Sequence, residues 1–338
     1  MTQHITKLLK RIPWFRLATN NEIPKPKPLK WASIKRMLIH RPVLFGVPTT
    51  VAKVYTEISN YDVEENIAHL MTMARIALEK GDLERAEAIL LMGIKISEEY
   101  KSYAVLPYMY DILASIAFAT GNLRKAETLL VNAIEKLVHL GVPENDNQVV
   151  DFKLRLARIY SAYNELELAE IGFKSCLDEQ KDKIEGGDTT TRTGLLYINC
   201  MFWYGLHKVK KSKYKEAKDL INSAYDYSIK IKGLSPYQEM VILYTLGDLN
   251  MELGEYNLAL QNLQSAILMG KGIGSLDLPR CYLKVAKIYT KMDAWDTAKI
   301  SAKEALRLGK LFNDELLCVE ADNLLMIIDD NLTLKKKQ

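Results

Sequence analysis

The chain has 338 residues, of which 48% are hydrophobic and 26% charged, a composition that excludes a largely disordered protein. Only 17 glycines and 10 prolines interrupt it, which favours long helices over many short strands. The charge is uneven, because residues 1–54 hold eleven Lys and Arg against a single acid, Glu22, whereas the remainder holds 35 basic and 41 acidic residues. We therefore expect a basic arm, residues 1–58, followed by a mildly acidic folded body.

The arm begins with MTQHITKLLKRIPWFRLA, which has the pattern of a basic amphipathic helix. Ile5, Leu8, Leu9 and Ile12 would share one face of that helix, and Pro13 would interrupt it. A basic, acid-poor amphipathic start is typical of a mitochondrial transit peptide. The alternatives are a patch that binds a membrane surface or nucleic acid, and an inert tail. The Pro-rich run EIPKPKPLK that follows favours an extended linker, and we expect no transmembrane helix anywhere in the chain.

A short phrase, a turn followed by an alanine, recurs six times after the arm. The spacing between consecutive copies is 39 to 48 residues. The central alanines are Ala86, Ala126, Ala169, Ala217, Ala259 and Ala298. Small residues also stand twelve positions before them, at Ala74, Ala114, Ala157, Gly205, Gly247 and Ala286, and seven positions after them, at Gly93, Ala133, Cys176, Ala224, Ala266 and Ala305. A larger apolar residue lies three positions before each central alanine, at Leu83, Leu123, Leu166, Tyr214, Tyr256 and Trp295.

Small residues at three fixed positions let two antiparallel helices approach closely and let the next pair pack against them. This is the pattern of tetratricopeptide repeats, helix-turn-helix units that stack into a superhelix. The predicted fold is therefore all-α: a right-handed superhelical solenoid of about six tetratricopeptide repeats over residues 59–312, a capping helix at 313–330 and a basic tail at 331–338. The Gly- and Thr-rich segment 185–194 is expected to be a loop, and GKGIG at 270–274 a helix stop.

The predicted capping helix has an apolar face and several acids. We expect Leu316, Leu317, Leu324 and Ile328 to cover the last open surface of the array while the acids face water, since terminal repeats need a polar outer side.

No pattern in the sequence indicates catalysis or a bound cofactor. The four cysteines form no CxxC pair and the five histidines no HxxxH pair, so we expect neither a metal site nor a redox pair. Cys176 is expected in the core. The protein is therefore predicted to be no enzyme and to need no cofactor and no metal.

Function is then expected on the surface, where the first helices of stacked pairs line a concave groove. Arg and aromatic residues are the usual anchors of protein interfaces, although ordinary helix packing or solvation remains the alternative for each residue. The groove residues projected from the repeat pattern are Tyr108, Phe118, Arg155, Arg158, Phe202, Trp203, Tyr244, Asp248, Lys284 and Lys287.

The third repeat carries features beyond the general pattern. Residues 146–184 combine an initial Asp-Asn pair, an LxLAxIYxAxN run and a Gly-aromatic-x-x-Cys segment, with Asn147, Asn164 and Gly172 as the most specific positions. This run resembles the third repeat of the mitochondrial tetratricopeptide repeat protein 19 family, and a weaker likeness extends over about residues 65–310. The resemblance implies import into mitochondria, association with the inner membrane, and support of respiratory complex III by binding the complex and helping to clear fragments of its Rieske iron-sulfur subunit.

The expected function is therefore a non-enzymatic factor of the mitochondrial inner membrane, matrix-facing or peripheral, with no nucleic-acid partner. Its groove would hold a segment of a complex III subunit through the Arg155/Arg158 and Lys284/Lys287 clusters. The alternative is a cytosolic adaptor similar to kinesin light chains, although residues 1–60 lack the heptads that precede the repeats in those proteins. A hydrolase hidden in the array is a third alternative, for which no nucleophile and base pair stands out.

Overall fold

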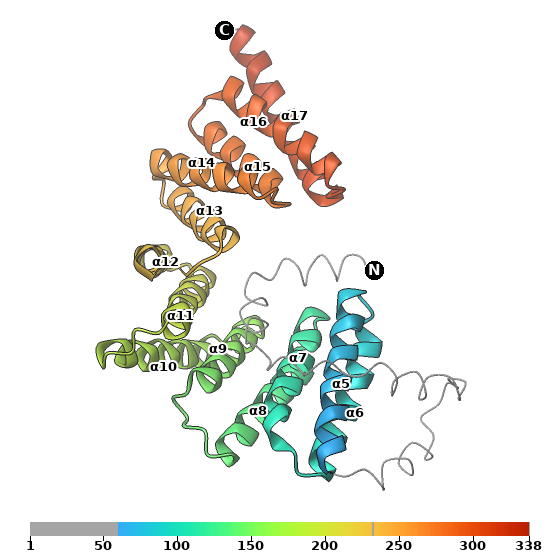
Figure 1. The fold of residues 1–338 in the computed structure, drawn as a ribbon. Coiled ribbons are helices and arrows are strands. Elements are labelled where there is room, and N and C mark those ends of the chain that lie inside the picture. The colour runs from blue at the N-terminus through green and yellow to red at the C-terminus, as the bar shows by residue number, and fades with distance from the viewer. Residues whose placement is uncertain (1–59, 232, 338) are drawn as a thin grey trace, which may run out of the picture. The chain divides into compact units, whose positions relative to one another are not determined.

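The computed structural model describes residues 60–231 and 233–337, so the predicted arm and transit peptide at 1–58 lie outside the described residues. The described residues form thirteen α-helices and one short 3-10 helix, with no strand among them (Figure 1). The all-α prediction is confirmed. None of helices α5–α17 combines the length and the apolar character that a membrane span needs.

The chain divides into two compact units, with the boundary between Phe152 and Lys153. In the first unit, α5 packs on α6, α6 on α7, and α7 on α8, as helical hairpins in chain order. Its elements are α5 (Asn60–Glu79), α6 (Leu83–Glu99), the 3-10 helix η1 (Tyr103–Val105), α7 (Leu106–Ala119), α8 (Leu123–His139) and the first residues of α9 (Asn147–Ala162).

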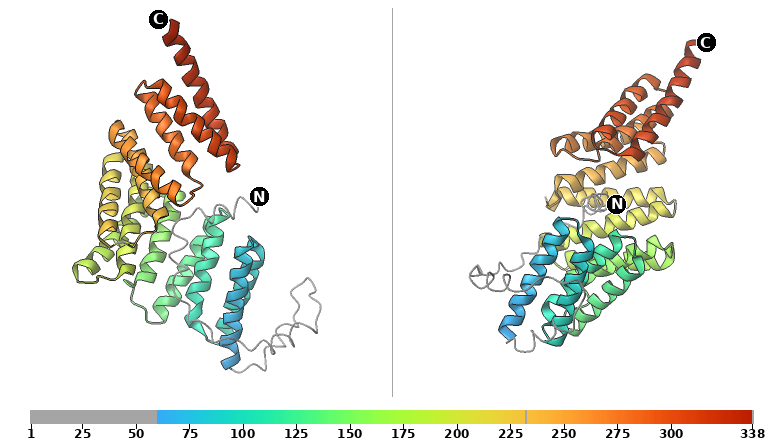
Figure 2. Two further views of the ribbon diagram at one scale, coloured as in Figure 1. Left: turned by 45° about the horizontal axis from the view of Figure 1, so that its top comes forward. Right: turned by 90° about the vertical axis from the view of Figure 1, so that its right-hand side faces the viewer.

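The second unit also consists of helical hairpins in chain order. Each of its helices from α10 to α16 packs on the helix that follows it (Figure 2). Its elements after α9 are α10 (Leu166–Glu185), α11 (Thr191–Lys210), α12 (Tyr214–Ile231), α13 (Pro236–Glu252), α14 (Tyr256–Gly272), α15 (Leu278–Lys291), α16 (Trp295–Leu311) and α17 (Glu315–Lys337).

The turn inside each pair has one conformation in all six copies. The residue five positions before the central alanine has a positive φ, and the amide of the next residue donates to a carbonyl five residues back, as when Asp82 N donates to Ala77 O at 2.9 Å. This is the Schellman ending of a helix, which glycine adopts without strain. The left-handed residues are Gly81, Gly121, Asn164, Ser212, Gly254 and Asp293.

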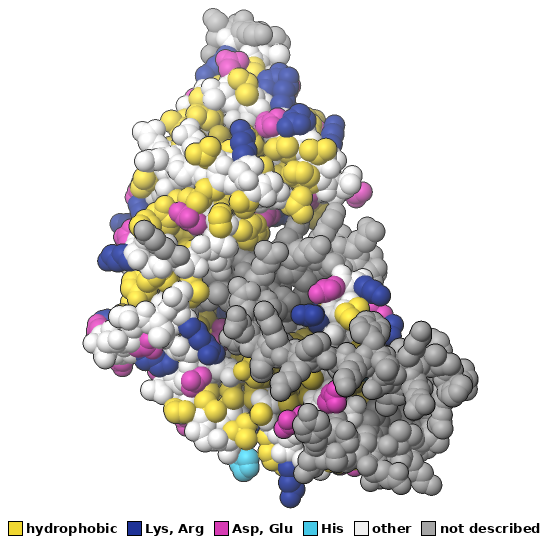
Figure 3. Space-filling view, viewed as in Figure 1, with side chains coloured by type: hydrophobic (Ala, Val, Ile, Leu, Met, Phe, Trp, Pro, Cys, Tyr) yellow, Lys and Arg dark blue, Asp and Glu magenta, His cyan; other side chains and the backbone are white. Residues whose placement is uncertain are grey.

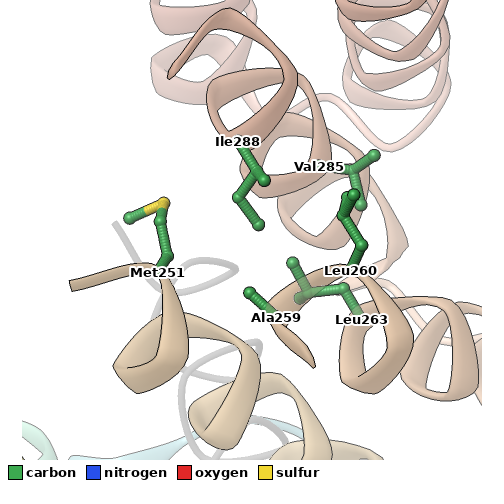
Figure 4. Close-up of a cluster of buried hydrophobic side chains, with 6 residues drawn as sticks. All are labelled: Met251, Ala259, Leu260, Leu263, Val285 and Ile288. Carbon is green, nitrogen blue, oxygen red and sulfur yellow. The ribbon is translucent and has the colours of Figure 1, made fainter. Parts of the chain in front are cut away.

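All eighteen small positions predicted from the repeat pattern are buried, which confirms the predicted register. The large apolar residue before the turn alanine is in each copy the first residue of the second helix. Around Ala259, the side chains of Leu263 and Ile288 converge from α14 and α15, and Met251 closes the cluster from the end of α13 (Figure 4). The stack is therefore held by apolar side chains that interlock across small positions.

Three of the small positions are glycine, and at two of them a methyl group does not fit. A Cβ atom on Gly205 would lie 2.6 Å from Ile221 Cγ1, and a Cβ atom on Gly247 would lie 2.6 Å from Leu263 Cγ. Each glycine thus lets a branched side chain of the second helix press against the backbone of the first.

The predicted loop at 185–194 is shorter in the structure, because α10 continues to Glu185 and α11 begins at Thr191. The correction has a local cause: Asp188 accepts hydrogen bonds from the Thr190 amide (2.9 Å) and the Thr193 hydroxyl (2.7 Å). These bonds start α11 within the threonine run. The stop at GKGIG is confirmed, since α14 ends at Gly272.

The last helix differs from its prediction in two ways. It runs to Lys337, so most of the residues expected as a separate tail after 330 are helical. Leu317 and Ile328 are buried as expected and Leu324 is half-buried, but Leu316 is 80% exposed. Successive helical residues are rotated by about 100°, which carries Leu316 away from the face that holds Leu317 and Ile328.

The glycine at position 247 gives a direct test of the close approach. Gly247→Ala should lower the free energy of unfolding, because overpacking costs about 1–3 kcal/mol and exceeds the gain of about 1 kcal/mol from better helix propensity. The matched control is Gly272→Ala in α14, where a Cβ atom meets nothing within 4 Å. Thermal melts of both variants check this, and a Gly247→Ala melt at or above that of the unsubstituted chain would contradict the packing.

Candidate functional site

The ten projected groove residues all lie on the first helices of pairs, α7, α9, α11, α13 and α15. Two of them belong to the first unit, where Tyr108 is exposed and Phe118 half-buried on α7. The other eight belong to the second unit, and they fall into two groups with different surroundings.

An arginine and a tryptophan stack on each other in the first group. The Arg158 guanidinium on α9 lies 3.6 Å from the centroid of the Trp203 ring on α11, and both side chains are half-buried. Trp203 in turn meets the Phe202 ring edge-on, with centroids 5.7 Å apart and an angle of 82°. Arg155, one turn before Arg158, is also half-buried. The cation–π contact fixes a planar cation at the surface of adjacent first helices.

Phe202 itself does not reach the surface, because it is 2% exposed. The projection placed Phe202 and Trp203 together in the groove. Adjacent positions on a helix point about 100° apart, so only one of the two faces outward, and that residue is Trp203. Phe202 is part of the core, and its ring packs against that of Trp203.

The second group lies on α13 and α15. Tyr244 is half-buried against two clusters of buried apolar side chains, and its burial, with a smaller effect of Asp248, raises its pKa above the ordinary value. The Lys284 ammonium forms an ion pair with Asp248. Lys287 pairs in the same way with Glu320 of α17.

These pairs change the expected role of the two lysines. Both are predicted to hold the partner segment, but each already faces a carboxylate of its own chain. Partly exposed pairs of this kind contribute about 0–1 kcal/mol, so an acidic partner would compete with them at little cost. The Arg158 and Trp203 pair is the better-defined anchor of the two groups.

A charged cluster that the sequence projection missed lies between α10, α11 and α12. Lys208 has a side chain only 7% exposed, and its ammonium bonds to Glu170 Oε1 at 2.5 Å and to Glu216 Oε2 at 2.8 Å. Lys211 also pairs with Glu170, and the Tyr204 hydroxyl donates to Glu170 Oε1 at 3.2 Å. One carboxylate thus receives donors from Tyr204 and Lys208 of α11 and from Lys211, the residue after that helix.

The titration behaviour follows from these contacts. Hydrogen bonds from Lys208 and Lys211 lower the pKa of Glu170 to about 2. Burial alone would lower the pKa of Lys208, but the hydrogen bonds to Glu170 and Glu216 outweigh it and raise that pKa. A sequence signal for this cluster exists, because Lys208 stands nine positions before its central alanine, where the other copies carry Ala77, Ala117, Tyr160, Asn250 and Tyr289.

His207, next to Lys208, is 2% exposed and belongs to the core. Its Nδ1 lies 3.1 Å from the Ser161 hydroxyl, and its ring lies 5.2 Å from that of Phe173. Burial lowers the pKa of His207 below the ordinary value, which keeps the ring neutral. Cys176 is buried as expected. Over residues 60–231 and 233–337, no three His, Cys, Asp or Glu side chains gather in a way that could hold a metal ion.

Comparison with curated proteins finds relatives of one kind. Tetratricopeptide repeat protein 19, mitochondrial, of Mus musculus is 26% identical over 281 residues, which cover 80% of this chain and 77% of the relative. The Homo sapiens protein of the same name is 25% identical over 265 residues, 75% of this chain and 70% of its own length. The homologue of Drosophila melanogaster is 21% identical over 276 residues, covering 81% and 75%. No protein-family model matches the chain.

Solved structures support the fold independently. The tetratricopeptide repeat sensor protein of the STAND ATPase class from Pyrococcus horikoshii matches with a TM-score of 0.59 at 18% identity, over 82% of this chain and 39% of that one. The apo form of the quorum sensor NprR from B. thuringiensis matches with a TM-score of 0.59 at 16% identity, over 96% and 81%. The chain has the tetratricopeptide repeat fold.

The cluster around Glu170 predicts a pH-dependent stability. Because the folded pKa of Glu170 is depressed, its contribution is complete above its ordinary pKa of 4.5 and is lost as the pH falls through about 2. Glu170→Gln should therefore cost about 1–3 kcal/mol at pH 7, and the difference from the unsubstituted chain should shrink between pH 4.5 and 2.

The control for this experiment is Glu185→Gln on the same helix, whose pair with Lys181 is exposed and spans 3.6 Å. It should change the free energy of unfolding by less than about 0.5 kcal/mol at either pH. Denaturant titrations at several pH values measure both variants. A loss in Glu170→Gln that is the same at pH 7 and pH 2 would contradict the assignment.

Proposed function

We propose that this chain, a homologue of the mitochondrial tetratricopeptide repeat protein 19, is a non-catalytic protein-binding scaffold of mitochondria that supports respiratory complex III. It binds the complex at the inner membrane, as a matrix-facing or peripheral protein, and helps to clear fragments of the Rieske iron-sulfur subunit. The observation that carries the proposal is the similarity to relatives of that name over 75 to 80% of the chain. The transit-peptide pattern of the arm supports the location independently.

The scaffold role is supported by the side chains on the surface of the repeats. The small residues that recur in every copy are buried and serve packing. Binding therefore depends on the side chains that vary between copies. Arg158 and Trp203 are the residue types that most often dominate protein interfaces, and they lie side by side on adjacent first helices. A partner segment lying along these helices would cover the indole and accept hydrogen bonds from the arginines.

The location is tested with a fusion of residues 1–60 to a fluorescent protein. The fusion should enter mitochondria, because import receptors recognise the positive charge and the apolar face that the sequence predicts for the N-terminal arm. Exchanging Lys7, Lys10 and Arg11 for Glu is the matched control and should leave the signal in the cytosol. A diffuse signal from the unsubstituted fusion would instead favour the cytosolic adaptor.

The binding role is tested by purifying the full chain from mitochondria and quantifying co-purified complex III subunits. Arg158→Ala should lower their recovery by about tenfold, because losing an interface anchor costs at least about 1.4 kcal/mol. Arg192→Ala is the control, an exposed arginine at the start of α11. Recovery of no complex III subunit above background with the unsubstituted chain, or equal recovery with both variants, would count against the proposal.

A further inference from the structure

The last helix, α17, is apolar on two sides. Its inner side packs on α15 and α16 through Leu317, Ala321 and Ile328, which are at most 4% exposed. Its outer side carries five large apolar residues that no described element covers. This outer stripe consists of Leu316 (80% exposed), Val319 (60%), Met326 (67%), Ile327 (54%) and Leu334 (61%).

The outer stripe lies on one side of α17, where the exposed Asn323 and Asp330 interrupt it. At 3.6 residues per turn its members fall within an arc of roughly 100° and extend over about 27 Å of helix. Apolar side chains reach the surface in the region where Figure 1 places α16 and α17 (Figure 3). A helix that is apolar all round is ordinarily buried, and the end of a repeat array ordinarily carries a polar outer side. Three acids of α17 face water as expected, but exposed apolar side chains accompany them.

Acidic side chains lie along the outer stripe. Residues 315–330 contain five acids and no lysine or arginine. Two of these acids face the body of the protein, where Glu320 pairs with Lys287 and Asp329 with Lys299. The other three, Glu315, Asp322 and Asp330, are exposed and form no ion pair among the described residues.

Lys335, near the end of α17, does not neutralise this surface. Lys335 bends toward the body, with its ammonium 3.3 Å from the Asp293 carbonyl and 6.0 Å from the centroid of the Trp295 ring. The outer stripe therefore keeps a negative rim along most of its length.

We propose that the outer stripe is a docking surface for a basic amphipathic helix of a partner protein. The length and narrowness of the stripe fit a helix laid along it, in the way that α16 covers α15 and α17 covers α16. The acidic rim selects lysine and arginine beside the apolar positions of that helix. A second copy of α17 would bring Glu315, Asp322 and Asp330 close to the same acids, which disfavours self-association.

This surface belongs to α17, whereas the proposed complex III anchor belongs to α9 and α11. The two proposals rest on different residues and fail separately.

The test uses the full chain and a labelled helical peptide with leucine at positions i, i+3, i+4 and i+7 and lysine elsewhere. Fluorescence anisotropy should show binding of this peptide and at least tenfold weaker binding of a peptide with glutamate in place of lysine. Leu316→Gln should weaken binding by about tenfold through lost apolar contact. The matched control is Leu268→Gln on α14, since Leu268 is 74% exposed and lies away from the stripe.

A second variant tests the charge. Asp322→Asn with Asp330→Asn should weaken binding about two- to fivefold and flatten its dependence on salt, because exposed carboxylates contribute modestly and are screened. Equal binding by Leu316→Gln and Leu268→Gln, or equal binding of the lysine and glutamate peptides, would overturn the proposal. A dimer that sedimentation detects and Leu316→Gln abolishes would also overturn it, in favour of a second copy.

Discussion

Close approach of helices at small residues is the constraint on which the whole structure depends. Where Gly205 or Gly247 lacks a side chain, Ile221 or Leu263 fills the space against the facing backbone. Elsewhere a buried alanine, Gly93 or Cys176 serves the same purpose. Because six copies share this geometry, the hairpins within each unit present similar surfaces to one another. Function is left to the positions that packing does not dictate.

The sequence predicted what repetition specifies. Six spaced alanines and their companions determined the helical pairs, the register and the turns, since a packing problem solved six times leaves a readable pattern. The sequence-based prediction was wrong where a residue in one copy differs from the residues at the same position in the other copies. The fold of 185–194 depended on Asp188 and two threonines, and the burial of Phe202 on a rotation of one residue. The Glu170 cluster joins three helices, and the sequence marks it only by a lysine at position 208, where the other copies carry uncharged residues.

The number of charged residues does not show which charges lie paired within the chain. Lys284 and Lys287 add to the basic total, but Asp248 and Glu320 neutralise them within the chain. Lys208 is a buried partner of two carboxylates and stabilises the fold. Arg158 stacks on Trp203, and the exposed acids of α17 lie beside the outer stripe. These two surfaces have opposite signs, and we expect them to serve different segments or different partners.

The central claim is that the first-helix surface around Trp203 holds a subunit of complex III. Photo-crosslinking from a benzoylphenylalanine residue placed at position 203, in intact mitochondria, measures this contact directly. The account predicts crosslinks to a complex III subunit that are absent when the same group is placed at position 268 on α14. Crosslinks at position 203 that include no complex III subunit above that control would contradict it.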